Sequence, residues 1–369
     1  MDLAEEREKI TALDRQMARL FEDRMEAVRA VAEYKRKRGL PIEDKEQEAR
    51  KLEEGESLLE DRELIPYYTQ FLQCSMDISK RWQRKLINGV KVAYSGVEGA
   101  FAHIAAGRIF PDGESIPYPS FEEAYAAVVR GDCDIAVLPI ENSYAGEVGQ
   151  VLDLMFSGQL HVNGVYDLSV TQNLLGVEGA STDSVKTVIS HPQALSQCAK
   201  YIRKHSFDAV STDNTAKAAK EVAERRDVSV AAVASEETAE LYGLKILDHD
   251  INEDRNNTTR FAVFSGTEDS GSRSAGTAFL LLFTVKDEVG GLAKAVNIIS
   301  AYGFNMRVLR SRPMKNLPWH YYFYAEVEGD DSSENGLRML SALRGACPVL
   351  KIAGRYSASC NSLQGGETI

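Results

Sequence analysis

Residues 1–89 carry the hydrophobic spacing of amphipathic helices. Apolar side chains recur at alternating steps of three and four residues along one face. The positions on this face are Ile10, Leu13, Met17, Leu20, Ala27, Val31 and Tyr34. Gly39-Leu40-Pro41 is a helix stop signal, so we predict a first helix that is roughly 50 Å long at about 1.5 Å per residue. Because that length exceeds the width of a small domain, we expect this helix to pack against a second copy of the chain.

Two shorter helices are predicted to follow, near residues 43–60 and 64–88. The apolar face of the second of these is marked by Ile65, Tyr68, Leu72, Met76 and Leu86. Residues 1–89 are therefore predicted to form an all-α helical bundle.

Residues 90–268 alternate short β-branched runs with helical stretches. The predicted strands are Lys91–Tyr94, Cys133–Leu138, Thr187–Ile189, Val228–Val233 and Phe261–Phe264. This alternation predicts an α/β domain, a twisted sheet with helices on its faces. Polar residues gather just after the strand ends, where such folds bind ligands.

Residues 277–357 follow a Ser- and Gly-rich stretch, residues 265–276, whose composition predicts a flexible linker. The order beyond it is β-α-β-β-α-β, which is the ferredoxin-like α+β arrangement. The predicted elements are strands at Thr277–Val285, Asn305–Ser311, Tyr321–Val327 and Val349–Tyr356, with helices at Leu292–Tyr302 and Ser333–Ala346. The tail after Tyr356 is expected to be disordered. The predicted domains are 1–89, 90–268 and 277–357.

Charge and cysteine usage narrow the classes of function. The net charge of −12 repels nucleic acid, anionic lipid and acidic metabolites, so an anionic substrate requires a local basic cluster. The Lys35–Arg38 run is surrounded by acidic residues, which argues against nucleic-acid binding. Scattered cysteines argue against a disulfide framework or a zinc site, and they favour a cytoplasmic protein. We expect no signal peptide, membrane span, metal or organic cofactor.

Several polar side chains occupy positions on the apolar faces of the predicted helices. Burial of such groups costs several kcal/mol unless they are paired or bind a ligand. They are Arg24 and Lys35 on the first helix, Asp44 and Glu48 on the second, and Ser79 and Gln83 on the third. Two interpretations remain open, an ion-pair network inside the bundle and a pocket for a dianion.

These residues, with Arg7-Glu8-Lys9-Ile10 and Leu13-Asp14, resemble the all-helical chorismate mutase family. The resemblance implies an interlocked helical dimer in which Arg7 enters the site of the other subunit. Arg24 and Lys35 would then contact the substrate's carboxylates and ether oxygen, Gln83 would donate to that ether oxygen, and Glu48 would hold its hydroxyl group. Asp44 and Ser79 would complete the site. The implied reaction is the pericyclic rearrangement of chorismate to prephenate.

One departure from this resemblance concerns the charge of the site. The family often has arginine directly before the glutamate, where this chain has Gln47. Either Arg50 or Lys51 replaces the missing cation, or the bundle has lost its mutase activity.

The stretch Asn256-Asn257-Thr258-Thr259-Arg260-Phe261 crowds polar side chains against an apolar strand. A hydroxyl and a guanidinium in this position suit a site that holds a carboxylate and donates a hydrogen bond. The alternative is a polar turn before the strand.

Four motifs in this segment resemble prephenate dehydratase. They are Gly96-Val97-Glu98-Gly99-Ala100-Phe101, Pro139-Ile140-Glu141-Asn142-Ser143, Ser190-His191-Pro192-Gln193-Ala194-Leu195 and Thr259-Arg260-Phe261. The resemblance implies two lobes, similar to periplasmic binding proteins, with the active site in the cleft between them.

This resemblance also assigns roles to individual residues. Thr259 would donate a hydrogen bond to the departing ring hydroxyl, and Arg260 would pair with a substrate carboxylate or support the loop. The remaining site residues would be Asn142, Ser143, Ser190, Gln193, Thr215 and Phe261. His191 is the rival acid, with a role in the turn as the alternative. Ala100 and Ala102 stand where the family usually has hydroxyl side chains.

The last segment resembles the ACT domain, an amino-acid-sensing module. The matching runs are Asp287–Leu292 and Arg310-Ser311-Arg312-Pro313. The resemblance implies L-phenylalanine as effector, bound between two such domains. The implied effector residues are Gly290, Gly291, Leu292, Asn305, Arg310 and Ser311. The glycines also suit simple turns, and Arg310 reverses the charge of the family's glutamate, so inhibition by phenylalanine is an open question.

Together the resemblances imply a bifunctional enzyme that takes chorismate through prephenate to phenylpyruvate, in phenylalanine biosynthesis. Two other readings stay open at this point. One is a dehydratase that carries a vestigial helical bundle, and the other is a non-catalytic amino-acid sensor.

Overall fold

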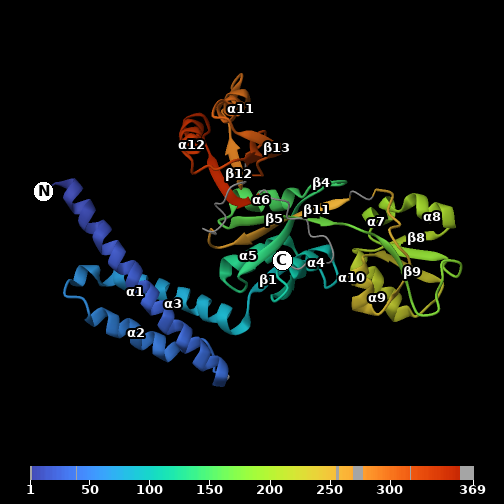
Figure 1. Ribbon diagram of the computed structural model, residues 1–369, viewed down its shortest axis with the longest axis horizontal. Helices are drawn as coiled ribbons and strands as arrows, with labels where there is room; N and C mark the ends of the chain where they lie inside the picture. Colours follow the sequence, from blue (N-terminus) through green and yellow to red (C-terminus); the bar gives the residue numbers. More distant parts are fainter. Residues whose placement is uncertain (1, 39, 255–256, 269–276, 316, 358–369) are drawn as a thin grey trace. The chain divides into compact units, whose positions relative to one another are not determined.

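The computed structural model describes residues 2–38, 40–254, 257–268, 277–315 and 317–357 (Figure 1). The chain divides into two compact units, residues 1–91 and 92–369, and each is described by itself. Gly39, Asn256, Cys360, residues 269–276 of the predicted linker and the tail after Ser357 lie outside the described residues.

The first unit is helical in its described part, as predicted. Its elements are α1 (Leu3–Arg38), α2 (Lys45–Ser57), the short 3-10 turn η1 (Arg62–Leu64) and α3 (Ile65–Asn88). The Asp44 carboxylate accepts a hydrogen bond from the Gln47 amide and caps α2. Gly55 on α2 is buried, and a Cβ at this position would collide with Leu72 of α3.

A row of apolar side chains on α1 is exposed in the part of the chain that the structure describes. Ile10, Leu13, Met17 and Leu20 are each at least half exposed, at 58%, 57%, 50% and 66%. These residues belong to the apolar face that we predicted to pack against a second copy of the chain.

The second unit contains two sheets within its described residues. The larger has ten strands in the order β13-β14-β12-β15-β5-β11-β3-β1-β2, with β4 paired to β3. Its strands are β1 (Lys91–Ser95), β2 (Glu114–Tyr118), β3 (Ile135–Asn142), β4 (Gly146–Glu147), β5 (His161–Ser169), β11 (Thr258–Ser265), β12 (Thr277–Thr284), β13 (Asn305–Pro313), β14 (Tyr321–Glu328) and β15 (Leu350–Ser357).

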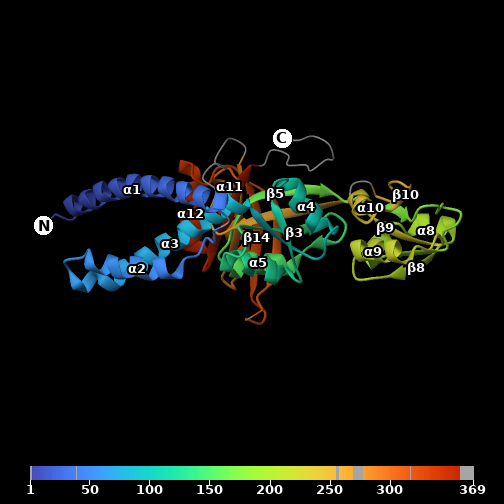
Figure 2. The same ribbon diagram turned by 90° about the horizontal axis from the view of Figure 1, so that it is seen from below.

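The smaller sheet has the order β10-β6-β9-β7-β8 among the described residues. Its strands are β6 (Asn173–Gly176), β7 (Thr187–Ser190), β8 (Asp208–Ser211), β9 (Val230–Ala234) and β10 (Lys245–Asp248). With α7 (Pro192–Gln197), α8 (Ala199–His205), α9 (Thr215–Arg225) and α10 (Glu236–Tyr242) it forms the yellow-green lobe of Figures 1 and 2. Hydrophobic clusters cover both faces of this sheet, as predicted for an α/β fold.

The chain passes between the two sheets twice. It leaves the larger sheet after β5 through residues 170–172, and it returns after β10 into β11. The alternative of a polar turn before the strand at Phe261 does not hold for Thr258, Thr259 and Arg260, because these residues already belong to β11 and pair with β5. Thr259 also lies opposite Asn142 of β3.

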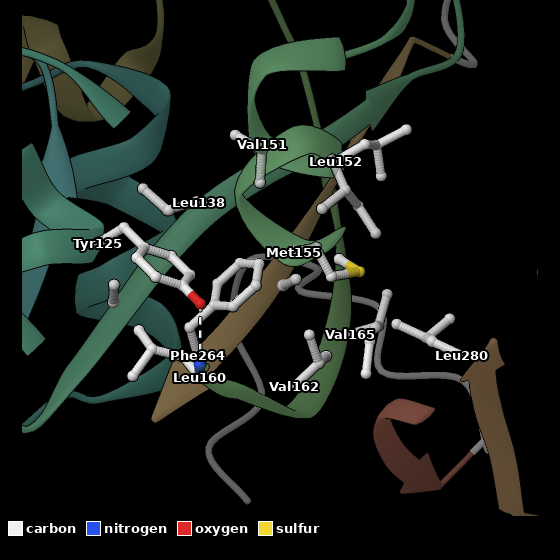
Figure 3. Packing of buried hydrophobic residues seen from close by; sticks show 14 of the residues in the cluster. Tyr125, Leu138, Val151, Leu152, Met155, Leu160, Val162, Val165, Phe264 and Leu280 are labelled. Atoms are coloured by element: carbon white, nitrogen blue, oxygen red, sulfur yellow. Dashed lines mark hydrogen bonds between the residues drawn. The ribbon is translucent and has the colours of Figure 1, made fainter. Parts of the chain in front are cut away.

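The core of the larger sheet is shared by the segments before and after residues 269–276. The segment before residues 269–276 contributes the helices α4 (Phe101–Ile109), α5 (Phe121–Arg130) and α6 (Gly149–Ser157). Figure 3 shows Tyr125 of α5 against Phe264 of β11, with the Tyr125 hydroxyl accepting a 2.8 Å hydrogen bond from the Leu160 amide. Leu280 of β12 belongs to the same cluster.

Residues 277–357 have the predicted order, β12, α11 (Gly291–Ala301), β13, β14, α12 (Glu334–Ala346) and β15. The prediction of a flexible linker before this segment did not indicate that the segment joins the larger sheet. In the structure β15 runs parallel to β5, and Gly354 lies opposite Val162. A Cβ at Gly354 would collide with the Val162 carbonyl oxygen, so the close approach requires glycine. We call residues 277–357 the C-terminal segment.

Two candidate active sites

A cavity of about 190 Å³ lies beside the segments that join the two sheets of the second unit. Its lining residues come from segments of both sheets and from their helices. The lining residues are Ala100, Phe101, Asn142, Val170, Gln172, His191, Gln193, Ala194, Gln197, Asn214, Thr215 and Thr259. The predicted residues Asn142, Gln193, Thr215 and Thr259 therefore meet in one cavity.

Asn142 is the centre of the hydrogen bonding in this cavity. Pairing of β3 with β11 sets it beside Thr259, and its Nδ2 donates to Thr259 Oγ1 at 2.9 Å. Its Oδ1 accepts from the Tyr144 and Ala145 amides at 3.0 and 2.8 Å, which fixes the orientation of the amide. Since Thr259 Oγ1 accepts from Asn142, its own O–H remains available to donate to a ligand.

Helix N-termini supply positive potential to the cavity. Ala100 and Phe101 stand at the start of α4, and Thr215 stands at the start of α9. Unpaired amides at such ends favour anions. Among the described residues that line this cavity there is no lysine or arginine, so carboxylate binding here rests on amides and neutral polar side chains.

His191 also lines the cavity, as the cap of α7. Its Nδ1 accepts a hydrogen bond from the Gln193 amide at 3.2 Å, so a neutral ring carries its proton on Nε2. The turn role and the acid role that the sequence left open are therefore compatible, because they use different ring nitrogens.

The structure places four of the predicted site residues outside the cavity lining. Phe261 is 1% exposed, and Ser190 is buried and donates its hydroxyl hydrogen to the Val233 carbonyl. Ser143 is exposed and accepts from the Thr258 amide. Arg260 faces away from Thr259, because neighbouring residues of a strand point to opposite sides.

Arg260 is held by two carboxylates. Its guanidinium lies 3.0 Å from Asp167 on β5 and 3.1 Å from Glu326 on β14, and the Glu326 side chain is only 3% exposed. Burial lowers the pKa of Arg260, but the hydrogen bond and charge of Asp167 and the charge of Glu326 outweigh this effect and raise the pKa above its ordinary value. Arg260 therefore ties the strand of Thr259 to the C-terminal segment.

Sequence reasoning missed three polar residues of this cavity, Gln172, Gln197 and Asn214. Gln172 lies on the segment that leaves β5, outside all four motifs. Its Oε1 is buried and, within the described residues, has no hydrogen-bond partner. No signal in the sequence marks Gln172, because its burial depends on the two sheets that this segment joins.

The helical unit contains a second cavity, of about 360 Å³. Its lining residues are Arg24, Ala27, Val28, Val31, Lys35, Ile42, Asp44, Gln47, Glu48, Lys51, Met76, Ser79, Lys80 and Gln83. The six polar residues predicted on the apolar faces of the helices all belong to this set. Arg7 is exposed on α1 and Arg50 is exposed on α2, and neither lines the cavity.

Hydrogen bonds fix several of these side chains. Arg24 donates to Ser79 Oγ at 2.6 Å, and Lys35 Nζ donates to the Ile42 carbonyl at 2.7 Å. Gln83 is 7% exposed, and its Oε1 has no partner among the described residues. This buried amide oxygen is available to accept a hydrogen bond from a group inside the cavity.

Lys80 is the charged lining residue that sequence reasoning missed. Its Nζ lies 3.0 Å from Glu48 Oε2 on α2 and 3.0 Å from Asp77 Oδ1 on its own helix. Burial lowers the pKa of Lys80, but the hydrogen bonds with Asp77 and Glu48 outweigh it and raise the pKa. Lys80 and Lys51 are cations in the cavity beside the uncharged Gln47.

Three of the predicted effector residues lie at the start of α11, and the other three lie on β13. Gly290 has a φ of 81° and caps α11, with Gly291 and Leu292 behind it. Asn305 Nδ2 donates to Glu328 at 2.7 Å, and Ser311 is exposed. Arg310 pairs with Glu141 of β3 at 2.9 Å, so its guanidinium reaches the residue next to Asn142.

Among the described residues no group of three or more His, Cys, Asp and Glu side chains is placed to hold a metal ion. The described helices also include none with the length and apolar character that a membrane crossing requires.

Comparison with protein families gives two matches. Residues 92–269 match the model of prephenate dehydratase, and residues 6–84 match the model of chorismate mutase type II. The chain is 30% identical over 366 residues to the bifunctional chorismate mutase/prephenate dehydratase of Aquifex aeolicus (strain VF5). That match covers 96% of this chain and 98% of the relative.

Solved structures also resemble this chain, among them two that each align over 73% of it. A structure described as GqqA, a novel type of quorum quenching acylases, aligns with a TM-score of 0.68 and 31% identity, over 73% of this chain and 98% of that chain. Prephenate dehydratase from Arthrobacter aurescens in complex with L-Phe aligns with a TM-score of 0.67 and 25% identity, over 73% of this chain and 90% of that chain.

Proposed function

The chain belongs to the bifunctional chorismate mutase/prephenate dehydratase family, and we infer that it catalyses both reactions of that name. Chorismate rearranges to prephenate in the helical cavity, and prephenate loses water and carbon dioxide to give phenylpyruvate in the two-lobed cavity. The observation that carries this assignment is the presence of two separate cavities, each lined by several of the polar residues expected for one of the two reactions.

We propose that the helical cavity accelerates the rearrangement without proton transfer. Arg24 and Lys35 bind the carboxylates and the ether oxygen, Gln83 donates its amide N–H to that oxygen, and Glu48 accepts from the ring hydroxyl. Binding holds the substrate in a compact conformer, and the donors stabilise the charge that develops on the breaking C–O bond.

We propose that Thr259 assists the leaving hydroxyl group in the dehydratase cavity. The bond from the ring carbon to the carboxylate breaks and releases carbon dioxide, its electron pair enters the ring, and the C–O bond breaks as the leaving hydroxyl takes up one proton, which solvent water ultimately supplies, and departs as water. Aromatisation drives this step. Because a threonine hydroxyl is a weak acid, Thr259 acts as a positioned donor while Asn142 holds its oxygen, and His191 Nε2 is the alternative proton source.

The assignment is tested by supplying chorismate to the purified chain and measuring prephenate and phenylpyruvate separately. Dehydration of added prephenate without consumption of chorismate would favour the dehydratase with a vestigial bundle. Loss of neither substrate would favour the amino-acid sensor.

We propose that the mutase site is completed by a second copy of the chain. The exposed apolar row Ile10, Leu13, Met17 and Leu20 supports a helical dimer, and the exposed position of Arg7 supports its contribution across the interface. The cytoplasmic location stays a prediction.

Mixing the variants Arg7→Ala and Gln83→Ala tests this sharing. After dissociation and reassociation, a hybrid dimer has one site with both changes and one site with neither. Because about half of randomly formed dimers are hybrids, the mutase activity of the mixture should recover to about a quarter of the wild-type value. Each variant alone, treated in the same way, is the control. A mixture no more active than the variants alone would place Arg7 outside the partner's site.

We propose that the C-terminal segment is an ACT domain that binds L-phenylalanine and inhibits the dehydratase. Its βαββαβ order and the left-handed Gly290 before α11 support this role. The ion pairs Arg260–Glu326 and Arg310–Glu141 connect it to the strands of Thr259 and Asn142. The L-Phe complex of the Arthrobacter relative adds support.

Replacement of Gly291 by valine should weaken phenylalanine binding at least about tenfold, because a Cβ there collides with the Lys286 carbonyl and distorts the start of α11. Calorimetry measures the binding, and the phenylpyruvate rate measures inhibition. Gly345→Ala on α12, where a Cβ has open space, is the matched control. If the wild-type chain binds no phenylalanine at millimolar concentrations, the sensor role is refuted.

A further inference from the structure

The helical cavity presents an electrostatic difficulty for the substrate that we propose. Chorismate carries two carboxylates, yet Asp44 and Glu48 also line the cavity. Like charges in a partly buried site repel and disfavour binding. The Asp44 carboxylate caps the N-terminus of α2, where the helix dipole stabilises a negative charge. Glu48 also lies in the first turn of α2, but it is not the cap residue, and its described ion-pair partner is Lys80.

Lys80 compensates the charge of Glu48 directly. It reaches from α3 to Glu48 on α2, with 3.0 Å between Nζ and Oε2, and both side chains are mostly shielded, at 18% and 26% exposure. Its other partner, Asp77, is 52% exposed and does not line the cavity. Lys80 therefore joins a cavity carboxylate to a surface carboxylate.

The charge balance of the cavity shows what Lys80 contributes. The lining cations are Arg24, Lys35, Lys51 and Lys80, and the lining carboxylates are Asp44 and Glu48, so four minus two leaves a net charge of +2. This net positive charge, to which Arg7 of a second copy would add, attracts a dianion. Without Lys80 the balance is +1, and Glu48 stands unpaired beside the substrate.

We propose that Lys80 is a positioning residue of the mutase site, which neutralises Glu48 and fixes its carboxylate to accept the ring hydroxyl of a dicarboxylate substrate. This inference rests on the proposed mutase function. Lys80 acts through Glu48 and does not itself touch the reacting atoms.

The variant Lys80→Met keeps the apolar stem and removes the charge. It should lower the mutase kcat/KM about 10- to 100-fold, with much of the loss in KM, because the dianion then meets an uncompensated carboxylate. Lys80→Arg should stay within about threefold of the wild type. Asp77→Asn, which removes only the surface partner, is the matched control and should also stay within that range. Dehydration of added prephenate reports that the second unit is intact.

A double-variant cycle separates this role from a purely structural ion pair. In a Glu48→Gln background the carboxylate is absent, so Lys80→Met should cost less than about threefold in mutase kcat/KM. A full 10- to 100-fold loss in that background would show that Lys80 does not act through Glu48. If Lys80→Met alone unfolds the bundle, the double variant, which removes the cavity carboxylate together with its cation and leaves only the half-exposed Asp77 without Lys80, gives the same decision.

The outcomes also distinguish this inference from the assignment beneath it. A wild-type chain that does not consume chorismate would refute the mutase function itself. A wild-type chain that consumes chorismate at a rate that Lys80→Met leaves unchanged would refute the role of Lys80 alone.

Discussion

Replacing Thr259 with alanine is expected to lower the rate of phenylpyruvate formation about 10²- to 10⁴-fold, the range typical for loss of a positioned acid or donor. The change removes the Thr259 hydroxyl, which lines the cavity and accepts a hydrogen bond from Asn142 Nδ2. The leaving hydroxyl then departs without a fixed donor. Chorismate consumption should continue, because Thr259 and the helical cavity belong to different units.

The measurement is a parallel assay of chorismate loss, prephenate accumulation and phenylpyruvate formation. Thr259→Ser, which keeps the hydroxyl, should retain substantial activity. Thr258→Ala is a matched control, because this neighbouring threonine does not line the cavity. Near-normal dehydration by Thr259→Ala would remove Thr259 from the mechanism and leave His191 as the proton source.

Replacing Gln83 with alanine should lower the mutase rate about 10²- to 10³-fold, as expected for a lost donor at a site of developing charge. Gln83 is 7% exposed in the cavity, and its Oε1 lacks a partner among the described residues. In our account its amide N–H donates to the ether oxygen as the C–O bond breaks. Water that enters the vacated space is neither fixed nor directed at that atom.

Initial rates of chorismate loss measure this effect, and dehydration of added prephenate should be unchanged. Gln70→Ala on the same helix is the control, because Gln70 is exposed and outside the cavity. Unchanged chorismate turnover in Gln83→Ala would mean that the helical cavity is not the mutase site.

The helical site was largely predictable, because its elements are local. Arg24, Lys35, Ser79 and Gln83 interrupt an apolar periodicity, and a polar residue on such a face must be paired or bind a ligand. Lys80 was not predicted as a site residue, because its partner Glu48 lies 32 residues away on another helix. The spacing of residues along one helix does not indicate which residues of another helix they contact.

The dehydratase site was predictable in part. Motifs at strand ends pointed to Asn142 and Thr259, which are 117 residues apart and meet because β3 pairs with β11. The face to which Arg260 points was not predictable, since it depends on the neighbouring strand that supplies Asp167 and on Glu326 in the C-terminal segment. Strand pairing of distant segments also decides that β15 joins β5, which composition alone does not show.

The central claim is that one chain carries both activities in separate sites. The most direct test supplies chorismate to the wild-type chain and follows chorismate, prephenate and phenylpyruvate in one time course. We predict loss of chorismate, appearance of prephenate and then formation of phenylpyruvate, with prephenate accumulating in Thr259→Ala and chorismate persisting in Gln83→Ala. Failure of the wild-type chain to convert chorismate, or to convert the prephenate that it makes, would contradict the account.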